Sequence, residues 1–472
     1  MIVSSCTKRK VQAMELIISN EITIHDPADE VRQWVYDTLK APNPEYDNKA
    51  RLGLWLGSTP RELKLYRTSG DSIIIPYGVC KSLFHAFPEF NTYAHKCVFA
   101  ENKPVNYNAS INLYPYQENA VNSLVRAQGG ILQSKAGSGK TRMGIALICA
   151  LGRKTLWLTH TNELLNQSYN AAAEFIDKKL LGKITAGKMN ISEGITFATV
   201  QTLSKADLNA LRYEWDMVVV DECHRCSGTV NKATMFSKVL NNLAARYKYG
   251  LSATLHRADG LIKCTYALLG GVAYTVPDDV VNTLRVEIQR RDTGVQISRK
   301  CLDTDGTLVY ARLINYLAEH EERNKQICRD IDKLVVRGHS IILLSDRVEH
   351  LNTICNMLSN VMVEREVVVL HGKVKKPDRE QALEQMRNKE KHILLATYQL
   401  AKEGLDVPCL DRLLLATPVK DYAIVVQSVG RIARVCEGKG TPVVYDYVDD
   451  IGFLEGMWKK RCSHYRKDGC IL

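Results

Sequence analysis

The chain has 472 residues, 45% of them hydrophobic and 24% charged, and this length predicts about three domains rather than a single core. The composition is typical of globular proteins, and the lack of any run of about 18 apolar residues excludes a membrane-spanning helix. Lys and Arg outnumber Asp and Glu by 63 to 52, which gives a net charge of +11. This charge favours a polyanionic partner such as nucleic acid, but a slightly basic protein without such a partner fits it equally well.

The N-terminus and the cysteines indicate where the protein works. Residues 1–10 carry charges with no apolar segment behind them, so no secretory signal is expected. The 14 cysteines have no framework spacing, and several lie inside apolar runs. Reduced thiols of this kind predict a cytoplasmic protein. No sequence feature indicates a protein partner.

Residues 1–110 differ from the rest of the chain and predict a small α+β module. A strand is expected over residues 15–24. The Asp-Pro pair at residues 26–27 is expected to begin a helix, with Asp as N-cap and Pro at the first helical position. Two more strands are expected near residues 63–66 and 72–75, separated by a Ser-Gly-Asp turn.

The remaining chain repeats a short apolar run, a polar or glycine turn and a helical pattern. Apolar runs with helical crossovers between them are typical of parallel sheets in an α/β layer. Turn residues at 276–306 interrupt the repeat and predict a hinge region there. The sequence therefore predicts two similar lobes, at 111–280 and 281–455, and a basic tail at 456–472. The apolar runs lie at 131–132, 155–158, 195–197, 218–220, 249–251, 341–344, 367–370, 393–395, 413–415 and 443–445, and a helix is expected with Ile327, Ile331 and Leu334 on one face.

A glycine-rich turn after the first apolar run carries the first chemical motif. Its glycines allow backbone N–H groups to surround a phosphate, Lys140 can reach the β- and γ-phosphates, and the Thr141 hydroxyl can bind Mg²⁺. Ser134 stands where the strict pattern has its first glycine, so this motif alone does not distinguish a nucleotide site from an ordinary turn. The candidate phosphate-binding residues are Gly137, Ser138, Gly139, Lys140 and Thr141.

A pair of carboxylates, Asp221 and Glu222, follows the apolar run at 218–220. Ligands gather at the carboxyl ends of strands in open α/β sheets. Asp221 is suited to hold Mg²⁺ and Glu222 to polarise the attacking water in phosphoryl transfer. An acidic turn after a strand is common by itself, but downstream of a phosphate loop the pair favours a nucleotide hydrolase.

Together with further short segments, these motifs make residues 111–450 resemble a superfamily 2 helicase, and they occur in the order found in that family. The resemblance implies two tandem RecA-like lobes, ATP and Mg²⁺ as cofactors, and ATP hydrolysis coupled to movement along a nucleic acid. It also implies that Gln117 contacts the adenine base. In the first lobe it implies nucleic-acid contacts by Thr161, Asn162, Thr199 and Thr202, and coupling of hydrolysis to movement by His224, Ser252, Ala253 and Thr254. The Cys-His pair after Glu222 is accordingly interpreted as the end of the acidic box rather than as zinc ligands.

The second lobe resembles the same family at two segments. The first implies that Thr397 contacts the strand and that Gly404 and Asp406 serve the nucleotide. The second, from Gln427 to Arg434, matches the arginine-finger motif, which implies that Arg431 and Arg434 reach the γ-phosphate. An inserted Arg stabilises transition-state charge and makes catalysis depend on lobe closure. Taken alone, these arginines are equally well a solvated helix face; the motif order favours the catalytic interpretation.

Residues 250–260 are similar to the XPB-like branch, in which an Arg-x-Asp element follows the coupling motif. The similarity implies a nucleic-acid contact by Arg257, although Ala258 stands where XPB has Glu. Three short pieces of the N-terminal module, at 43–46, 51–57 and 75–78, resemble the front module of UvsW-like phage helicases, which remodel branched DNA. That resemblance implies duplex engagement by the module and, if the chain is encoded by a phage, a location in the host cytoplasm. The alternative expectation is that the aromatic residues there, Trp55 and Tyr66, belong to its core.

The leading hypothesis is an ATP-dependent DNA helicase or translocase that unwinds or branch-migrates junctions, forks and R-loops in recombination, repair or replication. Its contacts are expected to be sequence-independent, because backbone contacts carry no base identity, and the family implies travel from 3′ to 5′. Two alternatives remain. One is an RNA-directed helicase or transcript-release ATPase, and the other is a nucleotide-gated nucleic-acid-binding scaffold without turnover.

Overall fold

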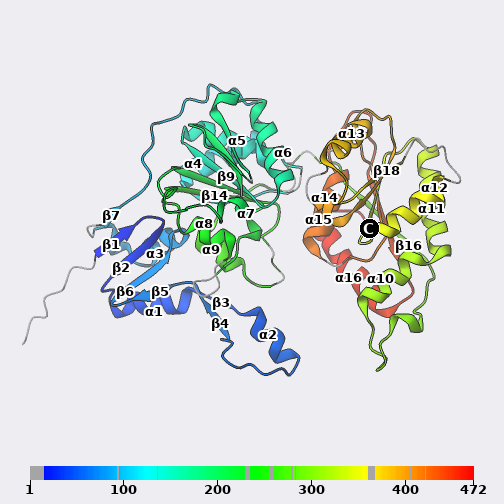
Figure 1. The fold of residues 1–472 in the computed structure, drawn as a ribbon, viewed down its shortest axis with the longest axis horizontal. Helices are drawn as coiled ribbons and strands as arrows, with labels where there is room; N and C mark the ends of the chain where they lie inside the picture. The colour runs from blue at the N-terminus through cyan, green and yellow to red at the C-terminus, as the bar shows by residue number, and fades with distance from the viewer. Residues whose placement is uncertain are drawn as a thin grey trace, which may run out of the picture. The chain divides into compact units, whose positions relative to one another are not determined.

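The computed structural model describes residues 15–92, 95–135, 137–185, 187–228, 234–255, 257, 259–277, 280–281, 283–359, 367–402, 405, 407–419 and 421–472. The chain forms two compact units that meet in sequence at residues 278–279. Figure 1 shows the N-terminal module and a large sheet in the first unit, and a second large sheet in the other. Among the described helices, none combines the length and the apolarity needed to cross a lipid bilayer.

The N-terminal module is a five-stranded sheet, with strands ordered β5-β6-β2-β1-β7. Alternate residues are buried, such as Ile22 and Ile24, so one sheet face packs on the core. The expected single strand over 15–24 is a hairpin, because the chain turns back at residues 19–20. Asp26 has a φ of 45° rather than the extended conformation of an N-cap, so the helix begins later than expected. The elements are β1 (Glu15–Ile18), β2 (Glu21–His25), α1 (Asp29–Thr38), β5 (Arg67–Ser69), β6 (Ser72–Pro76), α3 (Cys80–Ala86) and β7 (His95–Cys97).

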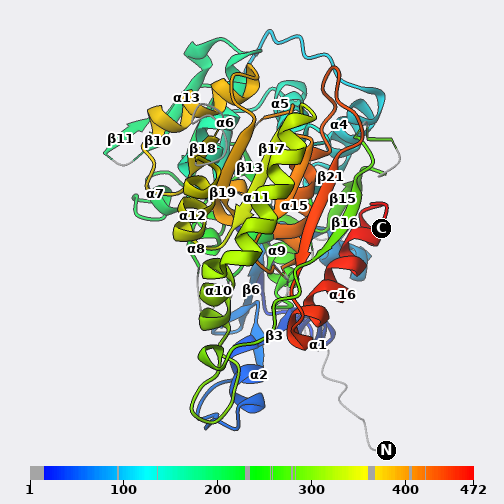
Figure 2. The same cartoon turned by 90° about the vertical axis from the view of Figure 1, so that its right-hand side faces the viewer.

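A separate projection, residues 40–64, leaves the module between α1 and β5, and we call it the arm (Figures 1 and 2). It consists of β3 (Lys40–Pro42), α2 (Pro44–Arg51) and β4 (Glu62–Lys64), with β3 and β4 paired antiparallel. Tyr66, just beyond the arm, is buried as expected for a core aromatic. Trp55 is 88% exposed, so the expectation that it belongs to the core is wrong.

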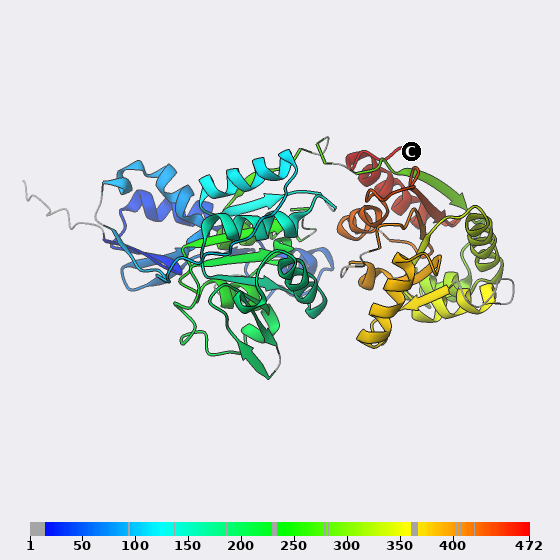
Figure 3. The same cartoon turned by 90° about the horizontal axis from the view of Figure 1, so that it is seen from above.

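The first lobe is built on an eight-stranded sheet, ordered β11-β10-β12-β9-β13-β14-β8-β15. Its described strand pairs are parallel except β10 with β11. Figure 3 shows helices on both sides of this sheet. The strands are β8 (Gly130–Gln133), β9 (Thr155–Thr159), β10 (Leu181–Thr185), β11 (Lys188–Asn190), β12 (Ile195–Thr199), β13 (Met217–Asp221), β14 (Tyr247–Ser252) and β15 (Val272–Thr275). The helices are α4 (Pro115–Ala127), α5 (Lys140–Leu151), α6 (Asn162–Ala173), α7 (Val200–Leu203), α8 (Met235–Leu240) and α9 (Ile262–Leu269).

The second lobe has a six-stranded parallel sheet, ordered β16-β21-β20-β17-β19-β18. Ile342 and Leu344 pack into one core, and Ile341 and Leu343 into another, so helices cover both faces. The expected helix bearing Ile327, Ile331 and Leu334 is α11, with all three side chains buried. The strands are β16 (Glu287–Asp292), β17 (Ile341–Ser345), β18 (Val367–Leu370), β19 (Ile393–Thr397), β20 (Arg412–Leu415) and β21 (Val443–Val448). The helices are α10 (Tyr310–Glu319), α11 (Glu321–Val336), α12 (Val348–Ser359), α13 (Lys376–Arg387), α14 (Tyr398–Lys402), α15 (Tyr422–Ile432) and α16 (Gly452–Lys467).

The predicted fold class is therefore confirmed: two parallel-sheet α/β lobes follow a small α+β module. One detail differs in the region expected to be a hinge, 276–306, because β16 lies within it and pairs with β21 along its whole length. A strand held by a full parallel ladder belongs to the lobe rather than to a linker.

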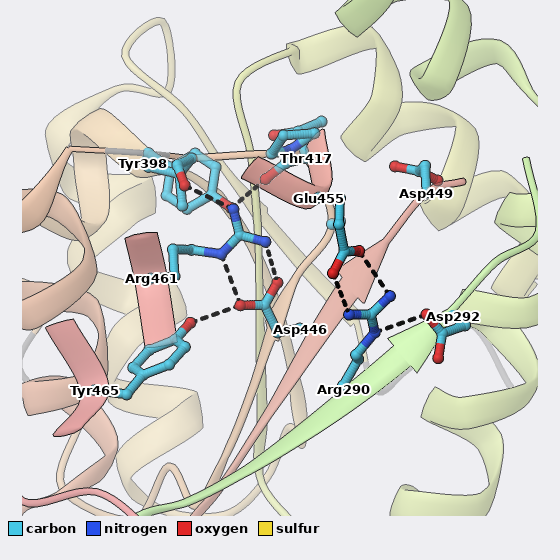
Figure 4. Close-up of polar contacts among 12 residues, drawn as sticks. Arg290, Asp292, Tyr398, Thr417, Asp446, Asp449, Glu455, Arg461 and Tyr465 are labelled. Atoms are coloured by element: carbon cyan, nitrogen blue, oxygen red, sulfur yellow. Dashed lines mark hydrogen bonds and ion pairs between the residues drawn. The ribbon is translucent and has the colours of Figure 1, made fainter. Parts of the chain in front are cut away.

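The C-terminal residues, expected as a separate basic tail, lie in and beyond α16, which is anchored to β21 (Figure 4). Arg461 is buried and donates to both carboxylate oxygens of Asp446 at 2.7 Å. The Tyr465 hydroxyl lies 2.7 Å from the same carboxylate, and the Ile471 N–H donates to the Val286 carbonyl. The charge of Arg461 is thus neutralised inside the lobe and is not exposed to a phosphate.

Candidate nucleotide and nucleic-acid site

The phosphate loop connects β8 to α5, and two of its glycines have left-handed backbones. Gly137 has a φ of 87° and Gly139 a φ of 83°, a region that residues with a Cβ adopt only at a cost. A Cβ on Gly139 would lie 2.5 Å from Nε2 of Gln117. Ser134 is not in the left-handed region, which explains why a glycine is not needed at that position. The loop opens a 12-residue helix whose N-terminal N–H groups suit an anion.

Replacing Gly139 with Ala is expected to weaken nucleotide binding about tenfold or more, because the new Cβ meets the Gln117 amide and the backbone must leave its left-handed conformation. The dissociation constant of a fluorescent ATP analogue measures the effect. Gly306→Ala is the matched control, since Gly306 has a φ of 81° and open space around it. Equal weakening by both variants would show that loop sterics are not the cause.

Asp221 and Glu222 stand at the end of β13, in the same sheet as the loop. Glu222 has a φ of 49°, an uncommon conformation for a residue other than Gly, Asn or Asp. Its N–H donates to Oδ1 of Asp221 at 3.0 Å. Burial, and then the neighbouring Glu222 carboxylate, raise the pKa of Asp221, whereas the Lys140 ammonium lowers it. The two motifs therefore share one electrostatic environment, and a divalent cation there would favour ionised Asp221.

Lys140, the first residue of α5, turns back toward its own loop, and its Nζ donates to the Ser134 carbonyl at 3.2 Å. A hydrogen bond from Ser168 to Asp221 also lowers the pKa of that carboxyl. Ser168 is buried in α6 and belongs to no recognised motif, so the sequence did not indicate it.

A polar chain joins the acidic pair to the predicted coupling motif. Nδ1 of His224 lies 3.2 Å from Oε2 of Glu222 and 3.0 Å from Oγ of Ser252. The Ser252 hydroxyl donates to the Thr254 carbonyl at 2.6 Å, so its oxygen accepts from the His224 Nδ1–H. Ala253 lies between these two residues. The Glu222 carboxylate thus lies beside a chain of two hydrogen bonds, which runs from the His224 ring through the Ser252 hydroxyl to the Thr254 carbonyl, just beyond β14.

Gln117 lies in the first turn of α4 and is buried. Its Oε1 accepts the Tyr114 N–H at 3.0 Å, and the Tyr114 and Tyr116 rings stack with centroids 5.9 Å apart. Gln117 is therefore held beside Gly139 of the phosphate loop. Its contact with adenine stays a prediction.

The predicted nucleic-acid contacts of the first lobe gather where β9 and β12, which are paired, end. The Thr161 hydroxyl caps α6 by accepting the Leu164 N–H, and Asn162 is the first residue of that helix. The Thr199 hydroxyl lies 2.9 Å from that of Thr202 in α7. Gln201, which no motif indicated, joins the two segments by donating to the His160 carbonyl at 2.7 Å.

Arg257 is engaged within the first lobe. Its guanidinium pairs with both oxygens of Asp259 at 2.9 and 2.6 Å and also donates to the His224 carbonyl. The hydrogen bond from Arg257 lowers the pKa of the Asp259 carboxyl. This arrangement ties the Arg-x-Asp element to the acidic box, and the predicted phosphate contact of Arg257 stays a prediction.

In the second lobe, Arg431 and Gln427 lie on α15 and Arg434 just beyond it. Arg431 donates to the Ala401 and Leu405 carbonyls at 3.0 and 3.2 Å. Gln427 is buried, and its Oε1 has no hydrogen-bond partner among the described residues. Thr397 ends β19. Gly404 and Asp406 lie outside the described residues, and the roles of all these residues toward the nucleotide stay predictions.

Fold and site together define a two-lobed ATPase with a phosphate loop. Residues 110–257 match the family model described as "Type III restriction enzyme, res subunit", and residues 322–436 match "Helicase conserved C-terminal domain". A probable helicase, D10 of Escherichia phage T5, is 30% identical over 339 residues, which are 72% of each chain. The chain therefore belongs to the superfamily 2 helicases, as the motifs predicted, and is a nucleic-acid helicase that uses ATP.

The chain is also similar to two more distant proteins. The DNA 3′-5′ helicase XPB of Kineococcus radiotolerans is 22% identical over 63% of this chain and 52% of its own. The crystal structure of T4 UvsW aligns over 97% of this chain and 98% of its own, with 18% identity and a TM-score of 0.42. The likeness to the XPB-like branch is thus also found by comparison.

Proposed function

We propose that the protein is an ATP-dependent DNA helicase or translocase that unwinds or branch-migrates junctions, forks and R-loops. The observation that carries this proposal is the fixed position of the N-terminal module beside the coupling elements of the first lobe. Cys264 and Ala267 of α9 belong to the core of the module, and α9 follows the Arg257–Asp259 pair directly in the chain. A duplex held by the module would thus be positioned relative to the residues that respond to hydrolysis.

The module is fixed to the lobe by close backbone contact. A Cβ on Gly78 would lie 2.5 Å from the Gly270 nitrogen, so no side chain separates the two backbones there. The Tyr77 hydroxyl donates to the Arg246 carbonyl at 2.8 Å, and the Ala100 N–H donates to the Ala244 carbonyl at 2.9 Å. The module thus packs directly against the first lobe.

Lys248 is buried at this junction and donates to the Leu240 and Asn20 carbonyls at 2.7 and 3.3 Å. Burial lowers the pKa of Lys248 to about 7, with a small opposing effect of Glu21. The unfolded chain binds this proton more readily than the folded one between pH 7 and the ordinary lysine pKa, so stability should rise with pH across that window. At ~1.4 kcal/mol per pKa unit, this rise in the free energy of unfolding amounts to a few kcal/mol. We expect Lys248→Met to flatten it. Urea unfolding at pH 7 and 9.5 measures it, and an unchanged slope would contradict the assignment.

The nucleotide site fits ATP with Mg²⁺. The left-handed glycines form a backbone cradle, and the raised pKa of Asp221 indicates a carboxylate arranged for a cation. Bound Mg²⁺–ATP would supply a polarised γ-phosphoryl group. In this proposal Lys140 binds the phosphates, Thr141 and Asp221 hold the cation, and Glu222 orients and deprotonates the attacking water. Arg431 and Arg434 of the second lobe are assigned to the γ-phosphate, and Gly404 and Asp406 to the nucleotide.

The RNA-directed alternative has its own support, since a relative of the chain is named "Putative ATP-dependent RNA helicase L396", of Acanthamoeba polyphaga mimivirus. ATPase stimulation and unwinding by a matched panel of single strands, duplexes, forks, four-way junctions and RNA hybrids separates the two. Stimulation greatest with forks and junctions supports the proposal. Stimulation by RNA with none by duplex or branched DNA would replace it with the RNA-directed function.

A further inference from the structure

The arm is a shaped element rather than a loose loop. Its base is a paired ladder in which Ala41 lies opposite Leu63, and Ala41 is buried in the core of the module. The buried Asn43 side chain donates to the Pro60 carbonyl at 2.6 Å and accepts the Glu45 N–H. Farther out, Nζ of Lys49 donates to the Thr59 hydroxyl at 2.8 Å. These bonds across the arm hold its outer end in one conformation.

The outer end of the arm, which we call the tip, carries three large apolar side chains in the open. Leu52 is 57% exposed, Leu54 54% and Trp55 88%. Water contact with so much apolar surface is unfavourable by about 25 cal/mol per Å², and clustered exposed apolar side chains mark interaction sites. The indole is also positioned, because a Cβ on Gly57 would lie only 2.8 Å from its Cζ3 atom. The ring rests on the backbone at Gly57 and presents its remaining surface outward.

The charges around the tip identify the kind of partner. Residues 48–61 contain Lys49, Arg51 and Arg61 and no Asp or Glu. Lys49 is paired with Glu45 at 3.0 Å, whereas Arg51 and Arg61 are exposed. An exposed aromatic ring that has cations on both sides of it in the sequence suits a nucleic acid, because every base offers a π-face for stacking and phosphates attract the arginines.

The root of the arm touches the coupling region. A Cβ on Gly260 would lie 3.2 Å from Cγ of Pro42, and Gly260 directly follows the Arg257–Asp259 pair. The arm therefore keeps a set distance from the residues that respond to ATP hydrolysis. Apolar side chains held in this way can enter between base steps and unstack them.

We propose that the tip is a base-stacking wedge. Trp55 stacks on an unpaired or branch-point base of the nucleic acid, with Leu52 and Leu54 beside it, while Arg51 and Arg61 bind the flanking phosphates. This assignment rests on the proposed function, which it extends by naming the contact that recognises a branch rather than a continuous duplex.

The test compares Trp55→Ala, Trp55→Phe and wild type in the full chain, using a fork with 2-aminopurine at the branch point and a blunt duplex. We expect Trp55→Ala to weaken fork binding about 5- to 150-fold, the range for loss of one base–aromatic stack, and to abolish the change in 2-aminopurine fluorescence. Trp55→Phe should retain most of both signals, and blunt-duplex binding should change little. Tyr213→Ala, which removes another exposed aromatic of the first unit, is the matched control.

The arginines have a separate readout. Replacing Arg51 and Arg61 together with Gln should lower the slope of log K against log salt by about 1–2 on the fork. If Trp55→Ala changes neither fork binding nor 2-aminopurine fluorescence, the wedge proposal is wrong. The same holds if the variant loses only self-association, vesicle binding or capture of a protein.

The two proposals fail differently. If wild type binds and unwinds forks and Trp55→Ala does so equally well, the wedge is wrong and the DNA motor stands. If only RNA stimulates hydrolysis, the DNA proposal is wrong, and the same variants on a branched RNA decide the wedge.

Discussion

Replacing Glu222 with Gln is expected to lower the turnover number for ATP about 10²- to 10⁴-fold, the range for loss of a general base. The amide keeps the size of the side chain and its place beside the His224 ring, whose Nδ1 lies 3.2 Å from the carboxylate. It cannot take a proton from water. Nucleotide affinity should therefore stay near the wild-type value, because the proposed site assigns phosphate binding to the loop and Lys140.

Phosphate release under saturating nucleic acid measures turnover, and a fluorescent ATP analogue measures affinity. Glu319→Gln, an exposed change on α10 in the other lobe, serves as the matched control. If Glu222→Gln hydrolyses ATP as fast as wild type, the chain does not use this site for turnover, and the nucleotide-gated scaffold becomes the better description.

The polar chain from Glu222 to Thr254 allows a further distinction. A variant that has lost turnover but still binds nucleic acid more tightly when ATP is present would retain the coupling through His224 and Ser252. Because Ser252 already donates to the Thr254 carbonyl, its oxygen depends on His224 for a donor. Coupling is thus expected to depend on His224 more than on Ala253, which contributes no polar side chain.

The lobes were predictable because parallel strands buried on both faces leave continuous apolar runs, as in Val218–Val220. The phosphate loop and the helix after it were predictable because their residues follow one another in the sequence, as Lys140 and Thr141 do at the start of α5. Contacts made between distant segments were not. Ser168 reaches Asp221 from the middle of a helix, and Gln201 joins two strand ends only after the sheet has formed.

Two errors have the same physical origin. Trp55 lies among leucines in the sequence, and this pattern favours a position in the core. In the structure, the ladder between β3 and β4 forms the base of the arm, and Trp55 is exposed beyond it, away from the sheet. Arg461 lies in a basic stretch of sequence, which favours exposure to solvent. In the structure its guanidinium is instead paired with Asp446 on strand β21. In both cases the side chain's environment is set by pairing across the fold, which local pattern does not encode.

Replacing Arg323 with Ala is expected to destabilise the second lobe by about 3–5 kcal/mol, the range for breaking a buried ion pair by removal of one partner. Arg323 and Asp449 are fully buried, with Nε 2.7 Å from Oδ1. Arg323 also donates to the Ala416 carbonyl at 2.7 Å, and the Thr293 hydroxyl lies 2.6 Å from Asp449. Loss of the guanidinium leaves a carboxylate in the core with one hydroxyl for compensation.

Urea unfolding followed by circular dichroism measures this loss, and Arg312→Ala, which breaks an exposed pair with Asp303, is the matched control with an effect below about 1 kcal/mol. The double variant Arg323→Met with Asp449→Leu should recover much of the stability, because it removes both charges from the core. A double variant as unstable as Arg323→Ala would show that packing around the guanidinium, rather than the uncompensated carboxylate, holds α11 against β21.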